Sequence, residues 1–135
     1  MHKEVFMSKF AEVKLYLHEM EIPIVQEDPD EELIVVDDEN NGVKNLVIDC
    51  EDPILVLEQV IMKVPDEPKD LFERLLIWNR ELIHGAFVLS EDAKTVLYRD
   101  TLQLENLDRN ELEASIQALG LALAEYSDDL LEYVK

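Results

Sequence analysis

The chain of 135 residues has a single cysteine, Cys50. One thiol excludes an intramolecular disulfide and a zinc site built from cysteines, and it fits a reducing compartment. Cys50 lies on a predicted strand among apolar neighbours, so we expect a buried thiol. The segment MHKEVFMSKF lacks the unbroken apolar core of a signal peptide, and no apolar run is long enough to span a membrane. We therefore expect a cytoplasmic protein.

Basic residues are scarce. The chain has 12 Lys and Arg against 32 Asp and Glu, which gives a formal net charge of -20 at pH 7. Such a charge repels polyanions, and the basic residues stand singly, with Lys69, Arg74 and Arg80 the nearest to a group. We therefore expect neither nucleic acid nor a membrane surface as a partner. Acids instead cluster between residues 27 and 39, which indicates a solvated loop face or, alternatively, an acidic decoy for a basic protein.

Glycine is also scarce, with three residues in the chain, and no glycine-rich phosphate loop, GxSxG or HExxH motif is present. The stretch DDENNG imitates the opening of a calcium loop. The twelfth position of that loop should be a bidentate glutamate, but it is Ile48 here, and strands are predicted on both sides. No metal or cofactor is expected.

The three histidines do not suggest a catalytic site. A nucleophile with a base needs Ser, Cys or Thr within reach of an oriented imidazole. His2 is near the start of the sequence, His18 lies off the apolar stripe of a predicted helix, and His84 lies where a second predicted helix ends, a position that suits an imidazolium. The sequence favours a protein that is not an enzyme. A small-ligand sensor or an enzyme using His84 and nearby acids is the alternative.

The chain does contain enough apolar residues, 47%, for one globular domain over residues 1–135. An apolar stripe predicts a first helix that ends before Pro23, carried by Phe6, Phe10, Val13, Leu17 and Met20. A longer stripe predicts a last helix, carried by Leu112, Ile116, Leu119, Leu123, Tyr126, Leu130 and Tyr133. Asp108 and Glu111 predict its capped start. Gly120 inside this helix predicts a close approach of another backbone.

Between these helices the pattern predicts three or four strands, a helix and two more strands. Short strands are expected at 22–25 and in ELIVVDD, with a turn at EDPDE between them. Asn41-Gly42 predicts a hairpin into VKNLVID. The run ILVLEQVIMKV at 54–64 is apolar on both faces, so something should cover the second face, and a second copy of the chain is the simplest candidate. We place Leu55, Leu57 and Ile61 on the covered or client-facing side of the sheet.

The helix after Pro68 is expected to run to Gly85, where a left-handed residue would end it. Its apolar stripe consists of Leu71, Leu75, Trp78 and Leu82, which we place in the core or at a dimer contact. Phe72, Leu76 and Ile83 flank this stripe and make it wide enough to contact two surfaces. The segment AFVLSEDAKTVLYRDTLQL predicts two strands joined by SEDAK. The fold class is α+β, with helices packed on a twisted antiparallel sheet.

Two motifs lie in the second half of the chain. Leu-x-x-Asn-x-x-Leu, followed by a small residue and Phe, is present through Leu76, Asn79, Leu82 and Phe87. Leu-x-x-x-Glu-Leu follows before the last helix, at Leu107, Glu111 and Leu112. With these motifs, the part of the chain from about 71 to 131 resembles the YbjN family of bacterial proteins, described as sensory transduction regulators.

The YbjN family is similar in architecture to the class I chaperones of type III secretion. That architecture is a helix, three strands, a helix, two strands and a helix. Those chaperones are small, acidic and usually homodimeric, and they bind an extended segment of a partner protein. The resemblance therefore implies a chaperone-like or regulatory protein-binding module that forms a homodimer and holds an unidentified protein client.

Overall fold

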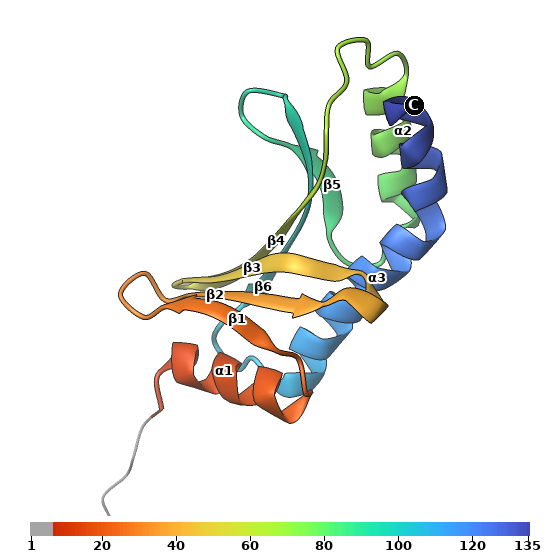
Figure 1. Ribbon diagram of the computed structural model, residues 1–135. Helices are drawn as coiled ribbons and strands as arrows, with labels where there is room; N and C mark the ends of the chain where they lie inside the picture. Colours follow the sequence, from red (N-terminus) through yellow and green to blue (C-terminus); the bar gives the residue numbers. More distant parts are fainter. Residues whose placement is uncertain (1–6) are drawn as a thin grey trace, which may run out of the picture.

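The computed structural model describes residues 7–135 as three helices and one six-stranded sheet (Figure 1). Two positions considered above, His2 and Phe6, lie outside the described residues, as does the rest of segment 1–6. The helices are α1 (Lys9–Glu19), α2 (Leu71–Trp78) and α3 (Arg109–Leu131). The strands are β1 (Ile24–Asp28), β2 (Leu33–Asp38), β3 (Val43–Glu51), β4 (Ile54–Lys63), β5 (Ala86–Leu89) and β6 (Thr95–Gln103). Short 3-10 turns are η1 (Glu39–Asn41), η2 (Asn79–Glu81) and η3 (Glu132–Val134).

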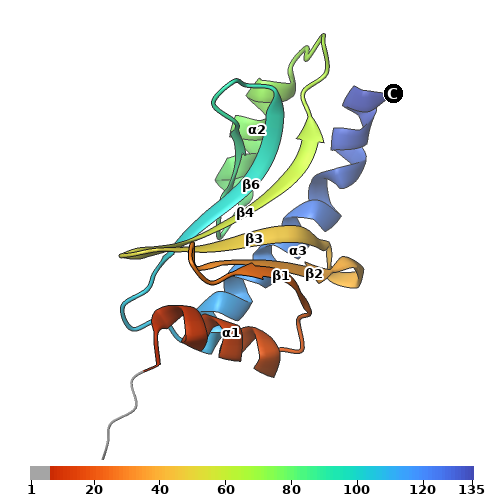
Figure 2. The same ribbon diagram turned by 60° about the vertical axis from the view of Figure 1, so that its left-hand side comes forward.

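The strands form one antiparallel sheet in the order β1-β2-β3-β4-β6-β5. Four strands precede α2, so the larger of the two expected numbers is correct, and the α+β class with helices packed on a twisted antiparallel sheet is confirmed. Figure 2 shows the twist: β1 to β3 run across the molecule, whereas β4 and β6 rise steeply beside α2. β1 continues through Glu27 and Asp28, so the turn is shorter than the predicted EDPDE.

The core lies between one face of the sheet and the three helices. The first and last helical stripes are confirmed: Val13 and Leu17 of α1 and Leu112 and Leu119 of α3 are buried. They pack with residues of the sheet that are also fully or nearly fully buried: Ile34, Val36, Leu46, Ile48, Leu55, Leu57, Val96 and Tyr98. Cys50 is buried as expected, and burial raises the pKa of its thiol to about 11. The thiol is therefore protonated at neutral pH.

β4 carries apolar residues on both faces, as predicted, because one face belongs to the core and the other forms part of an open groove. Leu55, Leu57 and Gln59 face the core. The amide of Gln59 is satisfied there, since it donates to the carbonyl of Gly42 at 3.1 Å and accepts from the amide of Lys44 at 2.9 Å. A bulge between Val60 and Met62 then interrupts the alternation.

Two local predictions were wrong in detail. The β2–β3 hairpin forms, but its connection is the 3-10 turn η1 followed by Gly42, which alone of Asn41-Gly42 has a positive φ, 80°. The second helix is shorter than expected, because α2 ends at Trp78 and, after η2, Leu82 is extended with ψ 130°. Gly85 does have a positive φ, 70°, but it lies at the entrance to β5 and not at the end of the helix.

The predicted close approach at Gly120 is confirmed. A Cβ at Gly120 would collide with the carbonyl oxygen of Asn41, and a Cβ at Gly42 would lie 3.3 Å from the Cα of Gly120. The two glycines therefore let the η1 loop rest directly on α3. Beside this contact, η1 and α3 border a groove of about 770 Å³.

Candidate partner-binding surfaces

The seven residues predicted to lie in the core or to contact a dimer partner or a client are buried or partly buried in the core of this chain. Leu55, Leu57, Leu71, Leu75 and Trp78 are buried, and Ile61 and Leu82 are partly buried against the same core. α2 and β4 thus present other side chains to solvent. The contact of the seven with a partner stays a prediction.

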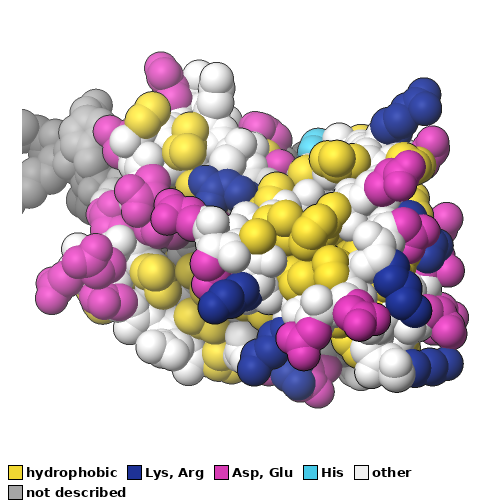
Figure 3. Space-filling view, turned by 90° about the horizontal axis from the view of Figure 1, so that it is seen from above, with side chains coloured by type: hydrophobic (Ala, Val, Ile, Leu, Met, Phe, Trp, Pro, Cys, Tyr) yellow, Lys and Arg dark blue, Asp and Glu magenta, His cyan; other side chains and the backbone are white. Residues whose placement is uncertain are grey.

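α2 and the loop after it do expose large apolar side chains. Leu76 and Ile77 of α2 are 70% and 54% exposed, and Ile83 is 90% exposed. Across a cleft of about 320 Å³ from Ile83 lies Leu121 of α3, which is 72% exposed. We call Leu76, Ile77, Ile83 and Leu121 the helix surface. Figure 3 looks down on the end of the molecule that includes α2 and shows hydrophobic side chains gathered in its middle, with acidic and basic ones around them. The sequence predicted a stripe wide enough for two surfaces, with Leu76 and Ile83 at its flanks. Apolar periodicity identifies the buried side of a helix, so the predicted contact residues were those of the core.

Aromatic and charged side chains fix α2 against the end of α3. Trp78 stacks on Tyr126 with ring centroids 4.8 Å apart. The guanidinium of Arg74 lies 4.7 Å from the Trp78 ring and donates to the hydroxyl of Tyr133 at 3.1 Å. Tyr133 in turn donates to Asp70 at 2.7 Å, and this bond lowers the pKa of that carboxyl. The helix surface is therefore presented on an anchored element and not on a loose one.

His84 is not at a helix end, so the expected interaction with a helix dipole is wrong. It lies in the loop between η2 and β5, where its backbone carbonyl accepts from the Tyr98 hydroxyl at 2.6 Å. Glu81 and Glu125 line the 320 Å³ cleft together with His84. Within residues 7–135, no three His, Cys, Asp or Glu side chains are grouped so that they could hold a metal ion.

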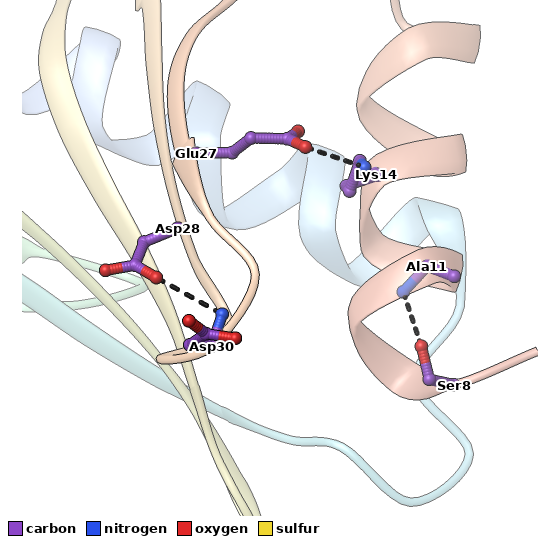
Figure 4. A network of polar contacts seen from close by, with 6 residues as sticks. All are labelled: Ser8, Ala11, Lys14, Glu27, Asp28 and Asp30. Carbon is purple, nitrogen blue, oxygen red and sulfur yellow. Dashed lines mark hydrogen bonds and ion pairs between the residues drawn. The ribbon is translucent and has the colours of Figure 1, made fainter.

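The outer edge of β1 has no neighbouring strand among the described elements. The side of this strand is exposed beyond Ile24, and Val25 is 54% exposed. Figure 4 shows how the strand is held: Lys14 of α1 binds Glu27 at 3.1 Å, and Asp28 accepts from the amide of Asp30 at 3.2 Å in the turn that follows. An ordered, unpaired edge of this kind can accept another strand.

The opposite edge of the sheet is blocked. The side-chain amide of Asn79 donates to the carbonyl of Phe87 at 3.1 Å and accepts from the Phe87 amide at 2.8 Å. These two bonds occupy the backbone groups in the middle of β5 that a further strand would need. β1 is therefore the edge that remains available.

The acidic stretch between residues 27 and 39 is divided by the fold. Asp28 to Glu32 lie at or beside the β1–β2 turn, whereas Asp37, Asp38 and Glu39 lie at the far end of β2. Four residues of β2, 33–36, lie between Glu32 and Asp37 and separate the two groups by about 17 Å. They do not form one continuous acidic face, which weakens the case for a decoy.

The face of the sheet opposite the helices carries a groove of about 520 Å³ across β3, β4 and β6. Its walls combine Val47, Val56, Val60 and Leu97 with the carboxylates of Asp49, Glu51 and Glu58 and the guanidinium of Arg99. Arg99 binds Glu58 at 2.7 Å. Oδ1 of Asp49 is buried and has no hydrogen-bond partner among residues 7–135. We call this the open-face groove. Val47, Asp49 and Glu51 alternate along β3 and therefore share one face, but no sequence pattern distinguishes Asp49 from the other acids.

None of the helices within the described residues has the length and apolarity that crossing a bilayer requires.

The fold is that of known chaperone complexes and of YbjN. YbjN from E. coli has a TM-score of 0.69 at 12% identity, over 95% of this chain and 96% of that one. A chain of the HopA1-SchA chaperone-effector complex has a TM-score of 0.61 at 17% identity, over 86% and 92%. A chain of the ExsC-ExsE complex has a TM-score of 0.61 at 20% identity, over 89% and 95%. At these identities the likeness shows the fold alone.

The sequence comparisons are more specific for one family. A search of the curated proteins found no match. The family CesT_Tir_1, however, matches residues 6–135, which is nearly the whole chain. The resemblance to YbjN and to type III secretion chaperones is thereby confirmed. The chain belongs to the CesT_Tir_1 family of type III chaperones.

Proposed function

We propose that this protein is a cytoplasmic, non-enzymatic binding module that works as a homodimer and holds an extended segment of a client protein. The observation that carries the proposal is the exposure of large apolar side chains on the anchored helix surface, on the same domain as a free strand edge. Membership of a chaperone family supports the same conclusion.

The helix surface is the proposed dimer contact. Its four exposed apolar residues lie on α2, on the loop that follows η2 and on α3, and other side chains of α2 and α3 pack in the core. Large apolar side chains are typical of the buried centre of a protein interface. A two-fold dimer uses the same surface of both copies, so the helix surface would pack against itself. Contact with a second copy here would bury these side chains. Full burial of one leucine or isoleucine side chain contributes about 1.5 to 3 kcal/mol.

The outer edge of β1 is the proposed client contact. A partner segment that adds there as a seventh strand would pair its backbone with that of β1. The backbone pairing would hold segments of different sequence. The exposed side chain of Val25 would add an apolar contact with the bound segment. The segment would extend the sheet on the side away from Asn79 and β5.

Light scattering after gel filtration tests the dimer. Wild-type protein should elute with twice the 15.7 kDa chain mass, and Ile77→Asp combined with Ile83→Asp should reduce it to the monomer mass. Val25→Asp combined with Val134→Asp is the matched control, because it adds the same two charges at exposed apolar residues of β1 and η3 and should leave the dimer intact. A wild-type monomer at micromolar concentration would contradict the proposal.

The client contact needs a separate experiment. Affinity purification from the native host, followed by mass spectrometry, should recover a protein with wild-type bait and lose it with Val25→Pro, because proline removes a backbone donor from the edge strand. Val134→Pro is the control, since it lies in the last short turn, η3. Equal recovery with both variants would exclude strand addition at β1.

A ligand sensor that uses His84 is the second candidate, and the observation that favours it is the 320 Å³ cleft that His84 shares with Glu81 and Glu125. A small-molecule collection screened by thermal shift tests it. A ligand that stabilises wild-type protein and not His84→Ala would support this function. If the screen finds no such ligand, this candidate function is excluded.

A further inference from the structure

The open-face groove is a part of the molecule that the proposed dimer and client contacts leave unused. No helix of residues 7–135 covers it, yet Val56 at its centre is only 8% exposed, whereas Val60 at one end is 64% exposed. The apolar side chains of a solvated sheet face are usually scattered among polar ones. Here the apolar side chains gather toward one end of a groove, and carboxylates lie at its other end.

The register orders the groove from an apolar end to an acidic end. Val60 pairs with Leu97, and Glu58 pairs with Arg99 in the next row. Asp49 then pairs with Val56, and Glu51 pairs with Ile54. Same-face rows are about 7 Å apart, because two residues of a strand separate them. Alternate side chains of an extended peptide have the same spacing.

The charges decide what can occupy the groove. Arg99 is committed to Glu58, so the carboxylates of Asp49 and Glu51 have no basic partner within the groove. A second copy of this chain would bring the same carboxylates, on a molecule of net charge -20, against them. A polyanion would be repelled as well. A segment with basic side chains complements the acidic end.

We propose that the open-face groove binds an extended segment of a partner protein whose alternate side chains are first apolar and then lysine or arginine. The apolar side chains would lie over Val60, Leu97 and Val56. The basic side chain would reach the buried Oδ1 of Asp49, which has no hydrogen-bond partner in the described part of the chain, and then Glu51. This inference rests on the proposed function and adds a second contact for the client, separate from the edge of β1, with a stated chemistry.

The titration of Asp49 agrees with this assignment. Burial, together with the neighbouring carboxylates of Glu51 and Glu31, raises its pKa from 3.8 to about 6. The groups that face it across the sheet are Glu58 and Arg99, which neutralise each other. A bound ammonium or guanidinium would favour the ionised carboxylate, so binding should weaken as the pH falls from 7 to 5.

The probe is a fluorescein-labelled peptide, Val-Ser-Val-Ser-Lys-Ser-Lys, titrated with the full chain and followed by fluorescence anisotropy. It should bind wild-type protein, and the affinity should fall at least tenfold with Asp49→Asn and Glu51→Gln combined. Asp66→Asn with Glu67→Gln is the matched control, because it removes the same two charges from exposed positions outside the groove and should change the affinity less than twofold.

A second pair of variants does not depend on removing acids. Val60→Lys should weaken the peptide at least tenfold because its ammonium competes in the groove, whereas Val134→Lys adds the same charge elsewhere and should have little effect. Equal losses with matched variants, no binding to wild type, or equal binding of a peptide with glutamate in place of lysine would overturn the proposal. Light scattering on the same samples separates the outcomes: lost peptide binding with an intact dimer leaves the proposed function standing.

Discussion

Gly42 and Gly120 meet where the η1 loop crosses α3, and this contact leaves no room for a side chain. Alanine is the better helix former by about 1 kcal/mol, but at position 120 its Cβ would press on the carbonyl of Asn41. We expect Gly120→Ala to lower the free energy of unfolding by about 1 to 2 kcal/mol. Urea unfolding measures it. Gln117→Ala, at an exposed position of the same helix, is the control and should be neutral or slightly stabilising. An equal gain for both would show that the contact is not tight.

Asp49 is the residue whose ionisation opposes folding. Its pKa is about 6 in the folded chain and 3.8 unfolded, so its contribution to stability is fully present below about pH 3.8 and is lost as the pH rises through about 6. Asp49→Asn should prevent this loss of stability, because asparagine does not ionise. Because the groove is open to solvent, we reduce the expected effect to about 1 kcal/mol of added stability at pH 7.5.

Urea unfolding of wild-type and Asp49→Asn protein at pH 4 and at pH 7.5 checks this expectation. The difference between the two proteins should be near zero at pH 4 and reach its full size at pH 7.5. The comparison cancels the other acids, which titrate in both proteins. A difference that does not change with pH would show that Asp49 titrates normally.

At the scale of the element, the helices and strands followed from apolar spacing wherever one face of an element is buried. The stripe of α3 and the cap at Asp108, which accepts from the amide of Glu111 at 2.8 Å, were predictable for this reason. α2 was predicted too long because Leu82 continues its spacing. In the fold, Asn79 turns its side chain to β5, and Leu82 reaches the core from an extended backbone. Spacing alone cannot distinguish these two routes to the same core.

Asn79 links α2 to the edge strand β5 through both polar atoms of its side chain. Asn79→Asp would retain the acceptor for the Phe87 amide but lose the donor to the Phe87 carbonyl. We expect a loss of about 1 to 3 kcal/mol in the free energy of unfolding, because a part-buried carbonyl is left unpaired. Thermal unfolding checks it. Asn40→Asp adds the same charge at an exposed position of η1 and should change little. Equal effects of the two variants would assign the loss to charge and not to the bonds.

The candidate surfaces were less predictable than the fold, for a physical reason. Apolar periodicity marks the residues that a chain buries in itself, so it selected Leu71, Leu75 and Trp78, which the core uses. The exposed Leu76 and Ile77 stand beside them in the sequence but on the other side of α2. The open-face groove depends on the register of three strands and on the pairing of Arg99 with Glu58, neither of which the spacing of one strand reveals.

For the whole molecule, a net charge of -20 on one domain means that acids repel one another across its surface, and the proposed dimer would add repulsion between its two copies. The seven ion pairs among the described residues are largely exposed, and such pairs contribute little. Stability must therefore come from the core and from screening by salt.

Raising NaCl from 20 to 500 mM at pH 7.5 should stabilise the folded chain by about 1 kcal/mol, which corresponds to a rise in Tm of roughly 3 to 6 °C for a domain of this size. Thermal unfolding by circular dichroism measures it, and light scattering at both salt concentrations should show more dimer in the higher one. The control is the same pair of salt concentrations near pH 4.2, the isoelectric point of the sequence, where the repulsion is absent and the shift should shrink. An equal shift at both pH values would assign the effect of salt to apolar burial, because that term does not depend on the net charge.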